Sequence, residues 1–70
     1  MDLEFSSVAR AQMAAEGIHR LEVEAIVASP DSVVTGDWLI RYDGQVAGRA
    51  LSVFVVADSD PPKVALLVVR

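Results

Sequence analysis

The chain has 70 residues, of which 53% are apolar and 23% charged, and a net charge of −4. This length fits a single small domain, residues 1–70, and the lack of cysteine excludes a disulfide scaffold, thiolate zinc sites and a cysteine nucleophile. The single histidine argues against a metal site, and the negative charge argues against DNA and RNA as partners.

The sequence also indicates where the protein resides. Its first residues, Met1 to Glu4, are acidic and lack the basic and apolar regions of a signal peptide. The longest apolar run, Val64 to Val69, is too short to cross a bilayer. We therefore expect a soluble cytoplasmic protein with no membrane partner and no cofactor.

The part of the chain before Pro30 is rich in Ala and Glu and predicts two helices. The first is expected over 8–16, with Ser6 or Ser7 as its N-cap and Gly17 as its C-terminal stop. Its buried side is expected to contain Ala9, Met13 and Ala15.

The second helix is expected over 20–28. His19 stands at its N-cap position, and Glu22 follows three residues later as the other half of a capping box. Val23, Ile26 and Val27 follow the i, i+3, i+4 spacing of a buried helix face.

After Pro30 valine dominates, and the pattern predicts strands over 33–35, 38–42, 49–57 and 63–70. In the second of these, Trp38 and Tyr42 share one side. The pair Asp43-Gly44 predicts a turn, with the loop running on to Gly48. In the longest strand, Leu51, Val53 and Val55 alternate with the residues of the opposite side.

This order predicts an α+β fold, with two N-terminal helices packed on one face of a three- to four-stranded, mainly antiparallel sheet. The last strand is apolar on both sides, so a second apolar face is left without cover. We expect that face to bind another copy in a homodimer or a different protein partner. Its predicted residues are Phe54, Val56, Ala65, Leu67 and Val69. A strongly curved sheet that closes on itself is the alternative.

Four residues are candidates for catalysis, each with a structural alternative. His19 has a side chain suited to proton transfer near neutral pH, but it also fits a helix cap. Arg41, Tyr42 and Arg49 would meet at the ends of the predicted hairpin and bind phosphate, or their charges would pair with nearby acids. Trp38 and Tyr42 would stack bases or serve as core or interface.

Three segments resemble a known bacterial family. These are 8–18, 23–27 with Ser29-Pro30, and 48–53, and the resemblance extends over roughly Phe5 to Val69. The family pattern is H-A-x-x-R-M-x-x-R-G-I, then V-E-x-V-L, N-P and G-R-x-L-x-V. This small domain family is mostly uncharacterised and is linked to the RelE- and BrnT-like ribonuclease toxins of toxin–antitoxin systems, so the resemblance implies that fold and an antitoxin as a candidate partner.

The chain departs from this pattern at its chemical positions. Val8 replaces the family's histidine, and Gln12 and Glu16 replace its two arginines, whereas Arg49 is carried over. Cleavage of RNA needs a base, an acid and positive charge near the phosphate. We therefore expect a non-catalytic module of the toxin-like type that acts through its apolar sheet. The alternative is a ribonuclease with its catalytic groups moved to His19, Arg41, Tyr42 and Arg49.

Overall fold

The computed structural model describes residues 2–70. In chain order the elements are β1 (Glu4–Phe5), α1 (Ser7–Glu16), α2 (Arg20–Ala28), β2 (Ser32–Thr35), β3 (Leu39–Val46), β4 (Arg49–Val56) and β5 (Lys63–Val69). The strands form one sheet in the order β1-β5-β4-β3-β2, in which β1 is parallel to β5 and all other pairs are antiparallel. The α+β class and the two helices are as predicted. The sheet has five strands instead of three or four, because the short β1 joins its edge.

Local capping signals determine the helix ends. The hydroxyl of Ser6 accepts a hydrogen bond from the backbone N–H of Ala9 at the start of α1, and Gly17 ends the helix in the left-handed conformation with φ 66°. His19 caps α2, and Glu22 closes the predicted capping box. The prediction that Ala15 is buried is wrong, because that side chain is exposed.

The strand β3 runs straight through Asp43-Gly44, so the predicted turn at this pair is wrong. Gly44 pairs with Leu51 of β4 in the middle of the hairpin. A Cβ atom at Gly44 would lie 2.8 Å from Cγ1 of Ile26, so α2 packs onto the sheet where β3 has no side chain. The glycine therefore allows a close approach of helix and strand and does not form a turn.

The actual hairpin turn consists of Ala47 and Gly48. Both have positive φ, 50° and 79°. Two central residues of this kind are typical of the type I′ turn, whose twist matches that of the flanking strands. The turn is therefore two residues long and lies beyond the site where the Asp-Gly pair predicted it.

In β5 a bulge changes which side chains face the helices. Phe54 pairs with Leu66, but the next residue, Val55, pairs with Val64, so Ala65 has no partner opposite it. Val64 and Leu67 are consequently both buried, at 0% and 1% exposure. The prediction that Leu67 and Val69 lie on the uncovered side is therefore wrong. Leu67 belongs to the core, and Val69 packs against it.

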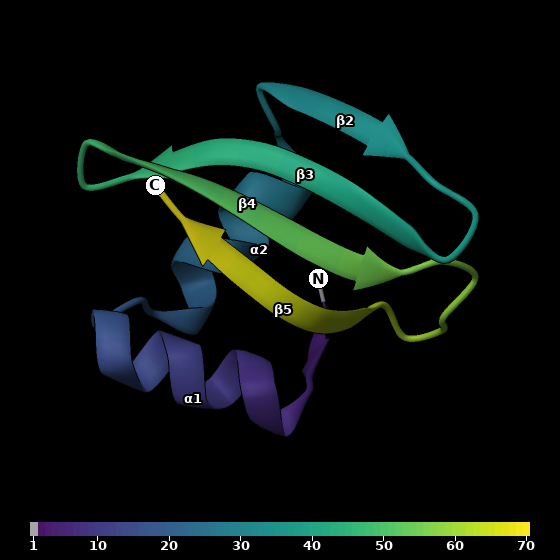
Figure 1. Cartoon of the computed structure of the whole chain (residues 1–70), viewed down its shortest axis with the longest axis horizontal. Helices are drawn as coiled ribbons and strands as arrows, with labels where there is room; N and C mark the ends of the chain where they lie inside the picture. Colours follow the sequence, from purple (N-terminus) through teal and green to yellow (C-terminus); the bar gives the residue numbers. More distant parts are fainter. Residues whose placement is uncertain (1) are drawn as a thin grey trace.

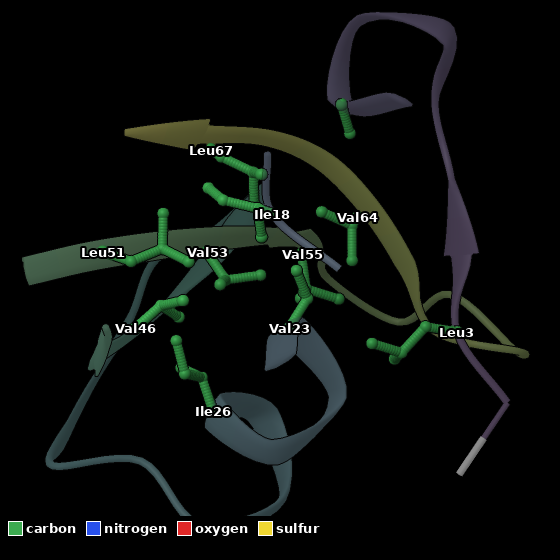
Figure 2. Packing of buried hydrophobic residues seen from close by; sticks show 11 residues of the cluster. Leu3, Ile18, Val23, Ile26, Val46, Leu51, Val53, Val55, Val64 and Leu67 are labelled. Carbon is green, nitrogen blue, oxygen red and sulfur yellow. The ribbon is translucent and has the colours of Figure 1, made fainter. Parts of the chain in front are cut away.

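Both helices lie on the same side of the sheet. Figure 1 shows α2 behind β3 and β4, and the contacts of α1 are with β5 and β1. Figure 2 shows Val23 and Ile26 of α2 facing the side chains of β4. The buried residues that form this single core are Leu3, Ala9, Ile18, Val23, Ile26, Val46, Leu51, Val53, Val55, Val64 and Leu67.

Side chains of the α1 segment cover the outer edge of β5 beyond β1. The Ser6 backbone N–H donates to the carbonyl of Val64, and its hydroxyl donates to the carbonyl of Ala65. The Gln12 amide then binds Leu67 twice, donating to its carbonyl at 2.7 Å and accepting from its N–H at 2.8 Å. The amide group thus replaces the peptide group of a neighbouring strand.

The close packing at Gly44 gives a testable consequence. We expect Gly44→Ala to lower the free energy of unfolding by about 1–3 kcal/mol, because the added methyl group overlaps Ile26. Urea denaturation of the Gly44→Ala, Ile26→Ala and double variants measures this. The double variant is expected to lose less stability than the sum of the two single variants, because the smaller side chain makes room for the methyl group. Strictly additive losses would contradict the contact.

Candidate functional site

The candidate site is the face of the sheet opposite the helices. We call it the uncovered face. Strand alternation and the pairing register assign to it the apolar residues Val34, Leu39, Phe54, Val56, Leu66 and Val68. Hydrogen bonds and register add the polar residues Ser32, Arg41, Asp43, Ser52 and Arg70. Figure 1 shows no helix in front of β3, β4 and β5.

The apolar part of this face lies across four strands. Val34 and Val68 are 48% and 39% exposed, whereas Phe54, Val56 and Leu66 are partly buried. Phe54 and Val56 are on the side where the sequence predicted them. Leu66 and Val68 take the places predicted for Leu67 and Val69, because of the bulge, and Ala65 is the bulged residue itself.

The polar part is a hydrogen-bonded cluster around Asp43, of which the sequence predicted only the pairing of Arg41 with a nearby acid. The hydroxyl of Ser52 donates to one carboxylate oxygen of Asp43 at 2.7 Å, and the hydroxyl of Ser32 donates to the other at 2.8 Å. The guanidinium of Arg41 lies 3.2 Å from the carboxylate, and Arg70 donates to the Ser52 hydroxyl at 3.1 Å. A sequence-based prediction of β3 as one continuous strand would have revealed this cluster, because strand alternation places Arg41 and Asp43 on the same face.

Hydrogen bonding stabilises the ionised form of Asp43. The hydroxyls of Ser52 and Ser32 lower the pKa of this carboxyl below its usual range, and Arg41 lowers it further. The carboxylate therefore stays charged on the uncovered face and offsets one of the two guanidinium charges beside it. This arrangement cross-links β2, β3, β4 and the residue after β5.

His19 serves as a helix cap in this structure. Its Nδ1 accepts a hydrogen bond from the backbone N–H of Leu21 at 3.2 Å. The backbone N–H of His19 donates to the Glu22 carboxylate at 2.8 Å. Glu22 and Glu24 are the two acids near enough in sequence to orient the imidazole for proton transfer, but Glu22 accepts from the His19 backbone N–H and Glu24 accepts from Arg20. The structural alternative for His19 thus accounts for the imidazole and for Glu22.

Arg41, Tyr42 and Arg49 do not meet at the end of a hairpin, and Arg41 pairs with the nearby acid Asp43, as the structural alternative predicted. Arg41 pairs with Phe54 on the uncovered face, whereas Tyr42 pairs with Val53 and packs against the core on the opposite face. Arg49 pairs with Val46, four residues beyond Tyr42 along β3. That separation corresponds to about 13 Å at the rise of a β-strand.

Arg49 is bound to the end of α1. One terminal nitrogen of its guanidinium donates to the Glu16 carboxylate and the other to the Glu16 backbone carbonyl, each at 3.0 Å. The two side chains are 41% and 42% exposed, so the ion pair itself adds little stability. The bond to the carbonyl satisfies an acceptor in the last turn of α1. Glu16 and Arg49 therefore bind one another at the end of α1.

Residues 2–70 contain no group of three or more His, Asp or Glu side chains placed to hold a metal ion, and none of their helices is long and apolar enough to cross a membrane. An open groove lies between α2 and the end of β3, lined in part by Glu22, Asp31 and Gln45. Trp38 is 84% exposed in the β2–β3 connection and does not share a face with Tyr42 in a strand.

Comparison with known proteins adds no assignment. The chain matches no family model, no curated protein and no solved structure. What the fold and the surface define is a class: an α+β domain with one helical layer and an uncovered sheet face. The resemblance to the toxin-like family stays a prediction.

The lowered pKa of Asp43 predicts how stability changes with pH. Because the folded pKa lies below the unfolded value of about 3.9, the carboxylate contributes stability that is complete above that value. This contribution is lost as the pH falls through the folded pKa. We expect Asp43→Asn to show a smaller acid-induced decrease in the urea midpoint than the parent chain. The exposed Asp37→Asn variant is the control and should keep the parent's pH dependence; a parent-like profile for Asp43→Asn would contradict the role of the cluster.

Proposed function

We propose that this chain is a small non-catalytic α+β interaction module that associates through its uncovered face. The observation that carries the proposal is the one-sided packing of the sheet: both helices contribute to a single core, while six apolar side chains lie on the other side. Contiguous apolar surface of this kind marks protein–protein contact sites. The first candidate for the partner is a second copy of the chain.

The charges on the uncovered face support self-association. The face carries the cations Arg41 and Arg70 together with the anion Asp43, so two copies related by a two-fold axis can place opposite charges against one another. Two sheets packed face to face bury their facing side chains in a layer about 10 Å thick. The apolar residues would supply that layer, and the polar cluster would lie toward its rim.

The family resemblance supplies the biological setting of this proposal. A module of the RelE- or BrnT-like toxin type that lacks the family's His and Arg positions would retain the fold and bind a protein, for which an antitoxin is a candidate. The four residues of the alternative ribonuclease give this setting no catalytic support, because Arg41 and Tyr42 lie on opposite faces and His19 and Arg49 bind helix termini. The interaction module therefore has the better support.

Self-association is tested with a substitution on the uncovered face. We expect the parent chain to be a dimer, and Val68→Lys to weaken its association at least about tenfold, because a charge enters the apolar contact. Analytical ultracentrifugation measures the mass, and circular dichroism shows that the variant stays folded. A parent chain that remains a monomer at all concentrations would contradict the proposal.

Two further variants control for position. Leu21→Lys changes a residue that is 64% exposed on the helical layer, and it should leave the dimer intact. Leu67→Lys changes a residue that is 1% exposed in the core, and it should unfold the chain rather than produce a folded monomer. A folded Leu67→Lys monomer would indicate that this side chain faces the partner after all.

The non-catalytic part of the proposal is tested by incubation with total RNA. We expect no cleavage by the parent chain, because neither an acid–base pair nor a cationic phosphate site is assembled from His19, Arg41, Tyr42 and Arg49. The reversion Val8→His/Gln12→Arg/Glu16→Arg restores the family pattern and serves as the matched comparison. Cleavage by the parent that His19→Ala or Arg49→Ala abolishes would overturn the proposal in favour of the ribonuclease.

A further inference from the structure

The two edges of the sheet differ in whether their backbone groups are covered by other parts of the chain. The edge at β5 is closed by β1, by Ser6 and by the double hydrogen bond from Gln12 to the backbone of Leu67. Among the strands of residues 2–70, β2 has a neighbour only on its inner side, where it pairs with β3. Every second residue of β2 therefore directs its backbone N–H and C=O away from the sheet.

Within the strand itself, β2 lacks the charged residues, prolines and bulges that usually prevent edge-to-edge pairing. Its four residues, Ser32 to Thr35, include neither a charged residue nor a proline, and its pairing with β3 has no bulge. All four are exposed, and Val33 and Val34, on opposite faces of the strand, are each 48% exposed. A strand added here would gain backbone hydrogen bonds and apolar contacts on both faces.

Acidic residues flank this edge on both sides. Asp31 directly precedes β2, and Asp37 lies six residues after Asp31, just beyond the end of the strand. Both residues are exposed. If two copies paired antiparallel through β2 with Val34 opposite Val34, Asp31 of each would lie opposite Asp37 of the other. Like charges directly opposite one another are destabilising in a sheet. The flanking charges therefore disfavour a second copy at this edge and favour a segment with basic ends.

We propose that the β2 edge binds an extended segment of a partner protein that has apolar residues at its centre and Lys or Arg on either side. The segment adds as a sixth strand, and its basic residues pair with Asp31 and Asp37. Trp38, which is 84% exposed and follows Asp37 directly, offers an aromatic surface to a cation at that end. This inference is independent of the proposed function, because it concerns the edge and not the uncovered face.

The test uses the full chain and a defined peptide, Lys-Arg-Thr-Val-Val-Val-Thr-Arg-Lys, whose two arginines are spaced like Asp31 and Asp37. We expect it to bind at least about tenfold more tightly than the same peptide with glutamate at all four basic positions. In NMR titrations the amide signals of Ser32 to Thr35 should shift, and those alternate amides whose N–H groups point away from β3 should become protected from solvent exchange. A peptide N-methylated at alternate backbone positions should not bind, because it cannot form the strand hydrogen bonds.

Three variants locate the binding and separate it from the uncovered face. Val33→Lys should abolish binding by blocking the edge, and this residue does not belong to the uncovered face. The double variant Asp31→Lys/Asp37→Lys should reverse the preference and select the glutamate peptide. Val68→Lys, which tests the proposed function, should bind the basic peptide like the parent chain.

Several outcomes would overturn the inference. These are no binding of the basic peptide, equal binding of the basic and glutamate peptides, and binding that Val68→Lys removes but Val33→Lys does not. Protection of the β2 amides that rises with protein concentration in the absence of peptide would also overturn it, because the occupant would then be a second copy. Failure of the parent to dimerise leaves this test unaffected, since the peptide titration works equally well on a monomer.

Discussion

The bulge at Ala65 determines which side chains of β5 face the helices, and much of the structure depends on it. Because β5 has one extra residue between the pairs Phe54–Leu66 and Val55–Val64, both Val64 and Leu67 point into the core. Leu67 also presents its backbone to the Gln12 amide, which holds α1 against the edge. A strictly alternating β5 would turn one of these two side chains outward, and α1 would lose either its apolar contact or its hydrogen bonds.

The composition of the uncovered face follows from the same constraint. Once Val64, Leu67 and Val69 face the helices, Leu66 and Val68 remain on the other side next to Phe54 and Ser52. Residues 2–70 form two short helices, and both lie on one face of the sheet. The polar cluster around Asp43 covers part of the other face, with Ser52 only 1% exposed, and the apolar remainder is left for a partner.

Local signals predicted the helices, and non-local contacts account for what the sequence could not show. Ser6, Gly17, His19 and Glu22 act within one helical turn of the ends they define, so both helices were predicted closely. The glycine of Asp43-Gly44 is needed because of Ile26, eighteen residues earlier, and no local pattern reveals that contact. A turn at Asp43-Gly44 would place Arg41 and Arg49 near one another, which is why the sequence predicted that they meet. Phe54 and Val56 were placed correctly because no bulge interrupts β3 and β4.

Val34 connects the two surfaces for which partners are proposed. It lies on the uncovered face, next to Arg41, and it is also a residue of the open β2 edge. A strand added at that edge would extend the sheet and cover part of the Val34 side chain. The uncovered face would then continue onto the added strand. The two surfaces therefore meet at Val34 but use different groups: a strand at the edge pairs with the backbone of β2, whereas association through the face covers the side chains of β3, β4 and β5. The covered β5 edge has no such connection, because α1 already occupies its backbone groups.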